Sequence, residues 1–92
     1  MKKFEYAVFT NATNPACCPD DADWFGTLPE AMEAAREAIA NGTPALDVEV
    51  QKFWTDAGDV AWNAPITFSE DGGAWSEDAG AREELGFIQG QF

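Results

Sequence analysis

Residues 27–42, TLPEAMEAAREAIANG, decide the fold class, because they carry the local signals of one amphipathic helix. Thr27 and Glu30 have the spacing of a capping box, in which each side chain satisfies a free backbone N–H at a helix start. Pro29 falls in the first turn, where a missing N–H costs nothing. Four apolar side chains share one face of this helix: Leu28, Met32, Ala35 and Ile39. Gly42 tolerates left-handed backbone geometry and predicts the end of the helix.

Alternation of apolar and polar residues predicts three strands, over residues 2–10, 46–55 and 60–69. The third run alternates most regularly. Its apolar face contains Val60, Trp62, Ala64, Ile66 and Phe68. Pro65 cannot donate a hydrogen bond to a neighbouring strand, so we expect this strand to lie at a sheet edge or to be bulged. Clusters of Asp and Gly predict turns at 56–59 and 70–73.

The remaining segments predict connections and a C-terminal extension. Residues 11–26 predict a long loop whose end is tied to the core by Trp24 and Phe25. Residues 78–85 predict a short helix that ends at Gly86, with Phe87 and Ile88 folding back on it. Trp75 is expected to pack against the core.

Together these elements predict a single α+β domain over residues 1–92. Its order is β-α-β-β, with the main helix packed on a three-stranded, mainly antiparallel sheet in two layers. Because the helix joins the first two strands, a right-handed crossover is expected if they share the sheet. The second and third strands are expected to pair as an antiparallel hairpin.

The net charge of −12, from 17 acidic and five basic residues, is the strongest signal about function. A chain with this charge repels nucleic acid and anionic membranes and is attracted to basic surfaces. Four Trp and seven Phe argue for a folded domain, since disordered chains lack such aromatic content. No segment approaches the roughly 20 apolar residues that span a bilayer. No apolar signal-peptide region follows the N-terminal lysines, so we expect a cytoplasmic protein.

The residue types argue against an enzyme and against a metal or cofactor site. The chain has no histidine, which is the commonest general base and metal ligand. The adjacent Cys17 and Cys18 are too few for a structural zinc site and are expected to be free thiols in a reducing cytosol. Asp20, Asp21 and Asp23 lack the spacing of an EF-hand, which favours a solvated loop over a calcium site. We therefore expect no catalytic residue, no cofactor and no bound metal.

The acidic residues become denser toward the C-terminus. Residues 56–92 carry eight acids and one base, a net of −7, whereas residues 1–55 carry nine acids and four bases, a net of −5. The expected partner-binding patch combines six of the C-terminal acids with a neighbouring tryptophan: Glu70, Asp71, Trp75, Glu77, Asp78, Glu83 and Glu84. An alternative patch consists of Asp20, Asp21 and Asp23.

In size and charge the chain resembles the small acidic inhibitors encoded by phages and mobile elements, namely the anti-CRISPR proteins and the DNA-mimicking antirestriction proteins. The resemblance covers bulk properties and no family motif. It implies a non-enzymatic protein of the host cytoplasm that blocks a basic nucleic-acid-binding surface of a defence complex, without binding nucleic acid directly. Eight acids match the charge of roughly 14 Å of duplex, so one local basic site is the expected target.

The alternative interpretation is a small cytosolic structural or accessory protein whose charge serves solubility. The sequence leaves the oligomeric state open.

Overall fold

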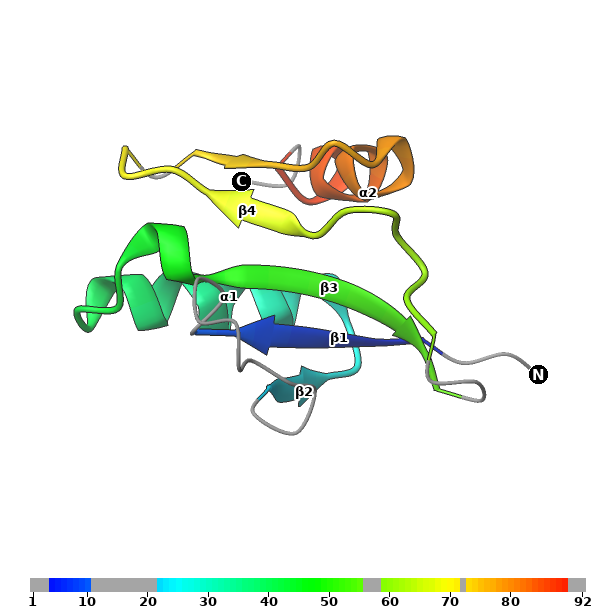
Figure 1. Ribbon diagram of the computed structural model, residues 1–92, viewed down its shortest axis with the longest axis horizontal. Coiled ribbons are helices and arrows are strands. Elements are labelled where there is room, and N and C mark those ends of the chain that lie inside the picture. Colours follow the sequence, from blue (N-terminus) through cyan, green and yellow to red (C-terminus); the bar gives the residue numbers. More distant parts are fainter. Residues whose placement is uncertain (1–3, 11–21, 56–58, 72, 90–92) are drawn as a thin grey trace.

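The computed structural model describes residues 4–10, 22–55, 59–71 and 73–89. These residues form an antiparallel sheet of five strands with two α-helices. Figure 1 shows how these elements are arranged. The strand order is β2-β1-β3-β4-β5. The strands are β1 (Phe4–Phe9), β2 (Asp23–Phe25), β3 (Glu49–Trp54), β4 (Ile66–Phe68) and β5 (Ala74–Trp75). The helices are α1 (Leu28–Ala40) and α2 (Ala79–Gln89), with a short 3-10 turn, η2 (Ala45–Asp47), between α1 and β3.

The α+β class is confirmed, but the expected number of strands is wrong. The two missed strands are β2, which lies at the end of the expected 11–26 loop, and β5, which lies in the expected C-terminal extension. Each has only two or three residues, too few for alternation to be visible in the sequence. They provide hydrogen-bond partners for the backbone N–H and C=O groups on the outer sides of β1 and β4.

The helix α1 begins and ends where its sequence predicts, but only half of the predicted capping box is confirmed, because the Glu30 carboxylate accepts from the Thr27 hydroxyl and not from a backbone N–H. The Thr27 hydroxyl accepts a hydrogen bond from the Glu30 N–H at 3.4 Å and donates one to Glu30 Oε1 at 2.9 Å. Gly42 has a φ of +113° at the other end, where its N–H donates to the Ile39 carbonyl at 3.1 Å. The buried side chains are Leu28, Ala31, Met32 and Ala35. The expected apolar face is therefore the one that packs on the sheet.

The connection made by α1 differs from the expected crossover. β1 pairs in antiparallel fashion with both β2 and β3, so β2 and β3 run in the same direction with β1 between them. The chain therefore reverses at β2 before α1 begins, and α1 joins β2 to β3. The first and second predicted strands share the sheet but are antiparallel, so the handedness rule for parallel strands does not apply to them.

The third predicted strand is interrupted by a large bulge. Val60 pairs with Phe53, and Ile66 pairs with Val50. Between these pairs the third strand has five residues, 61–65, and β3 has two, so three extra residues leave the ladder. The predicted bulge near Pro65 is confirmed. The other alternative, a position at the sheet edge, does not apply, because β4 lies between β3 and β5.

The bulge also changes which side chains of the predicted apolar face are buried. Trp62, Ile66 and Phe68 are buried, but Val60 is 53% exposed because it precedes the bulge. The residues that lead into α2 hold the bulge in place. The buried Ser76 hydroxyl donates to the Ala64 carbonyl at 2.9 Å.

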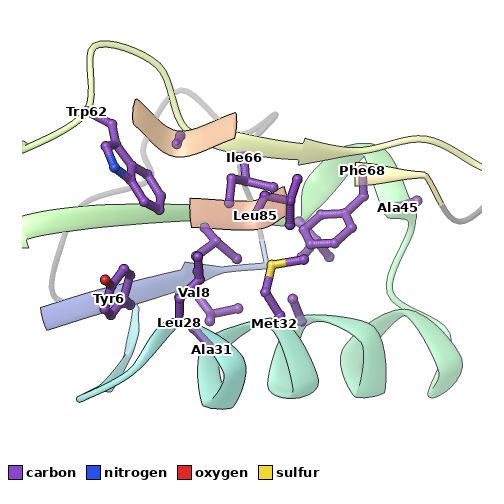
Figure 2. Close-up of a cluster of buried hydrophobic side chains, with 14 residues drawn as sticks. Tyr6, Val8, Leu28, Ala31, Met32, Ala45, Trp62, Ile66, Phe68 and Leu85 are labelled. Carbon is purple, nitrogen blue, oxygen red and sulfur yellow. The ribbon is translucent and has the colours of Figure 1, made fainter. Parts of the chain in front are cut away.

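The core lies between the sheet and the two helices. Figure 2 shows the part of it that lies between α1 and the strands. Its buried cluster draws side chains from every layer, including Tyr6 and Val8 from β1, Met32 from α1 and Phe68 from β4. Leu85 enters from α2 and is 5% exposed. The predicted short helix therefore contributes to the core. It continues through Gln89, so the predicted end at Gly86 is wrong.

We expect Ser76→Ala to lower the free energy of unfolding by about 1–3 kcal/mol, because it leaves the Ala64 carbonyl and the Asp78 N–H unpaired in a buried place. Urea unfolding measures the effect. Thr67→Val is the control, since it also removes one hydroxyl but at an exposed position. It should cost under about 1 kcal/mol. Equal costs for the two variants would contradict a specific role of Ser76 in holding the bulge.

Candidate functional site

The surface described by the structure carries almost only negative charge. Ten acidic side chains are exposed, compared with one basic side chain, Arg36. The exposed acids are Glu5, Asp23, Glu30, Glu33, Glu37, Asp59, Glu70, Asp71, Glu77 and Glu83. Lys52 and Arg82, the other two bases in the described residues, are half-buried. Most of the chain's charge excess is therefore available to a partner.

The structure divides the predicted patch into two kinds of acid. Glu70, Asp71, Glu77 and Glu83 are exposed, whereas Asp78 and Glu84 are half-buried. The two half-buried carboxylates make hydrogen bonds that connect different elements of the fold.

Glu84 is the centre of a polar cluster that joins α2 to the rest of the domain. The Tyr6 hydroxyl donates to Glu84 Oε1 at 2.7 Å. Lys52 Nζ and Trp62 Nε1 donate to Glu84 Oε2 at 3.0 Å and 3.1 Å. One carboxylate thus binds side chains from β1, β3 and the bulge. A group with these bonds serves the fold and is a poor candidate for contact with a partner.

The partners of Glu84 are themselves packed together. Lys52 Nζ lies 3.9 Å from the centroid of the Phe4 ring, and the Tyr6 and Trp62 rings are 5.8 Å apart. Burial, followed by the hydrogen bond and charge of Glu84, raises the pKa of the Tyr6 phenol well above its ordinary value. Tyr6 therefore stays protonated and remains a donor to Glu84.

Asp78 caps the N-terminus of α2. Its Oδ2 accepts from the Ala81 N–H at 2.8 Å, and its Oδ1 accepts from the Asn63 N–H at 3.0 Å. Its own N–H donates to the Ser76 hydroxyl at 3.1 Å. The bonds from Asn63 and Ala81 hold the pKa of this carboxyl below its usual value. The same carboxylate therefore caps a helix and fixes the bulge.

Asp71 is exposed but is held within the turn between β4 and β5. The Ser69 hydroxyl and the Gly73 N–H both donate to Asp71 Oδ1, the latter at 3.1 Å. These two bonds, with Ser69 the larger influence, lower the pKa of Asp71. The predicted turn at 70–73 is confirmed by the bond from the Ser69 N–H to the Gly73 carbonyl at 2.9 Å.

The aromatic residues expected to pack on the core are only partly buried. Trp75 is 57% exposed on β5, and the Arg82 guanidinium lies 4.8 Å from the centroid of its ring. The expectation that Trp75 packs against the core is therefore wrong. Phe25 packs against the core as expected, but Trp24 is 42% exposed and lies against Phe53. Successive strand residues face opposite sides, which separates these two neighbours.

The alternative patch falls largely outside the described residues, as do Cys17 and Cys18. Asp20 and Asp21 lie there, whereas Asp23 is exposed at the start of β2. Within the described residues, no group of three His, Cys, Asp or Glu side chains is placed to hold a metal ion. None of the described helices has the length and apolar character needed to cross a membrane.

A hollow of about 300 Å³ near the end of α1 is lined by Arg36, Ile39, Ala40 and Phe68. Arg36 is the titratable group in this lining, so the hollow offers no acid–base pair for catalysis.

One sequence signal pointed to the Glu84 cluster. Lys52 continues the alternation of the core residues Val48 and Val50, so it lies on the same face of the strand. A cation on the face that points to the core requires a nearby anion or aromatic ring. Here it has both, from Glu84 and Phe4.

No family model, curated protein or solved structure matches this chain.

We expect Glu84→Gln to lower the free energy of unfolding by about 1–3 kcal/mol, because an amide keeps one acceptor oxygen for three donors and leaves Lys52 without its anion. The matched control is Glu83→Gln, at the exposed neighbouring position, which should stay within about 0.5 kcal/mol of the wild type. Thermal or urea unfolding compares the two. Similar losses would show that Glu84 is not a structural anchor.

The cap made by Asp78 should make stability depend on pH. Because its pKa is lowered in the folded state, Asp78 contributes stability above the unfolded value of 3.8 and loses it as the pH falls through the folded value. Asparagine can replace only one of the two acceptor oxygens. We therefore expect Asp78→Asn to be less stable than the wild type at neutral pH, with the difference narrowing below pH 3.8. Urea unfolding at neutral and acidic pH tests this, and a constant difference would contradict it.

Proposed function

We propose that this protein is a non-enzymatic acidic inhibitor that blocks a basic nucleic-acid-binding surface of another protein, as the phage-encoded inhibitors that it resembles do. The observation that supports the proposal is the ratio of ten exposed acids to one exposed base in the described residues. A surface of one sign attracts a basic partner over a distance and repels nucleic acid.

The exposed acids extend over several elements. Glu30, Glu33 and Glu37 follow the exposed side of α1 at intervals of three and four residues. Glu70 and Asp71 lie in the turn between β4 and β5. This spread of charge favours rapid association with a basic surface more than it favours one ion pair.

The acids of the predicted patch differ in their exposure, which supports four of them as partner contacts. Glu70, Asp71, Glu77 and Glu83 are exposed, and so is the Trp75 ring in the same part of the chain. Asp78 and Glu84 are bonded within the fold. An experiment that reverses Glu84 would therefore mix a loss of binding with a loss of stability.

The test is retention of proteins from a bacterial lysate on immobilised wild type, with mass spectrometry of what is retained. Nucleic-acid-binding proteins should be retained at low salt and released by high salt, because exposed charges are screened over about 8 Å at physiological ionic strength. Duplex DNA should also displace them. Retention indifferent to salt and to DNA would overturn the proposal, and retention of nothing would favour a role of the charge in solubility.

The double variant Glu77→Lys with Glu83→Lys should then slow association with the retained partner about tenfold at low salt. The matched control, Glu33→Lys with Glu37→Lys, changes the net charge by the same amount on α1. Stopped-flow or surface-based kinetics compares the two. An equal effect of both variants would mean that net charge, and not the predicted patch, determines association.

A further inference from the structure

Two of the exposed large apolar side chains lie on either side of one aromatic ring. Trp24 is 42% exposed, and its ring centroid is 5.2 Å from that of Phe53. Val60 is 53% exposed and is paired with Phe53 across the ladder. Phe53 itself is 9% exposed. The three side chains form an apolar strip that crosses the sheet from β2 to the segment that follows β3.

This strip belongs to the sheet face opposite the helices. Tyr6 faces the core, so its neighbours Glu5 and Ala7 face the other way. Ala7 is paired with Trp24, and Glu5 is paired with Phe53. Residues directly opposite on paired strands share a face. In Figure 1, β1 and β3 pass in front of α1, and β2 lies beside β1.

An exposed carboxylate adjoins the strip. Glu5 is exposed, and it lies directly opposite Phe53 in the pairing of β1 with β3. We call Glu5, Trp24, Phe53 and Val60 the Trp24 patch. The patch combines two exposed apolar groups with one negative charge and contains no basic residue.

Charge decides what kind of molecule can cover the Trp24 patch. With a net charge of −12, a second copy of the chain would be repelled, and so would nucleic acid or an anionic membrane. A basic protein surface would be attracted. At protein interfaces, much of the affinity comes from aromatic side chains that are buried from water at the centre of the contact. Ion pairs between solvent-exposed acids and bases contribute little by themselves.

The chain itself shows how it accommodates cations. Lys52 Nζ lies 3.9 Å from the centroid of the Phe4 ring, and Arg82 lies 4.8 Å from the centroid of the Trp75 ring. In the first case a carboxylate, Glu84, binds the same cation at 3.0 Å. The Trp24 patch offers the same two components, a ring and a carboxylate, with Trp24 exposed to solvent.

We propose that the Trp24 patch receives an arginine side chain of the basic partner, with the guanidinium stacked on Trp24 and paired with Glu5. The inference rests on the proposed function and names the contact that supplies its affinity. Arginine fits better than lysine, because a planar guanidinium stacks on an aromatic ring and sheds its water more easily. Val60 and Phe53 cover the aliphatic part of the side chain.

The experiment measures the affinity of the intact protein for an oligo-arginine peptide and for an oligo-lysine peptide of equal length, by isothermal titration at low salt. Trp24→Ala should weaken binding of oligo-arginine roughly two- to fivefold, which corresponds to a cation–π contact of about 0.5–1 kcal/mol at an exposed site. The loss should be smaller for oligo-lysine. Val60→Asn and Glu5→Gln should each weaken the binding of oligo-arginine as well.

Two controls separate this patch from the rest of the surface. Leu46→Ala removes an apolar side chain that is 62% exposed, and Glu33→Gln removes one exposed negative charge on α1. Neither should change the preference for arginine. Circular dichroism confirms folding of each variant, and Val60→Asn keeps the test valid if Trp24→Ala unfolds.

The outcomes distinguish the two proposals. If the wild type binds neither peptide in a salt-dependent way, the proposed function fails and this inference fails with it. If the wild type binds both peptides but the Trp24 patch variants bind like the controls, the inference fails and the proposed function stands. If sedimentation shows a dimer that Trp24→Ala dissociates, the patch is a self-association surface and the inference is overturned.

Discussion

The carboxylate of Glu84 is the interaction on which the arrangement of the domain depends. It accepts hydrogen bonds from Tyr6, Lys52 and Trp62, which belong to β1, β3 and the bulge before β4. The apolar contacts of Ala81 and Leu85 also hold α2 to the sheet. Apolar contacts are not directional, so the Glu84 cluster, together with the bond from the Asn63 N–H to Asp78, directs the orientation of α2 over the sheet.

Much of the fold could be predicted because its signals are local. Thr27, Pro29 and Gly42 mark the ends of α1 through the chemistry of single residues. Alternation over six residues was enough for β1 and for β3. The remaining strands depend on groups far away in the sequence. β2 and β5 are too short for a pattern, and the bulge before β4 is held by Ser76 and Asp78.

The candidate site was harder to predict than the fold, as Glu83 and Glu84 illustrate. They are adjacent and chemically identical, yet one is exposed and the other binds three donors. Successive helical residues point about 100° apart, so neighbours commonly have different environments. The positions of Ala81 and Leu85 mark the buried side of α2, and Glu84 lies beside it. The positions of Ala81 and Leu85 predict that Glu84 lies beside the core only if the helix is known to pack on the core.

The contact between Tyr6 and Glu84 joins residues 78 positions apart in a chain of 92. During synthesis, β1 and β3 can therefore pair long before the group that completes their polar cluster has been made. In the bulge, the Ala64 carbonyl and the Asn63 N–H also lack these hydrogen-bond partners until Ser76 and Asp78 have been synthesised. Such distant contacts slow folding, because the entropy of a long loop is lost before the contact is gained. Until α2 has been synthesised, β3 and the segment that follows it lack the hydrogen bonds of Ser76, Asp78 and Glu84, so this domain can be completed only after residue 84 has left the ribosome.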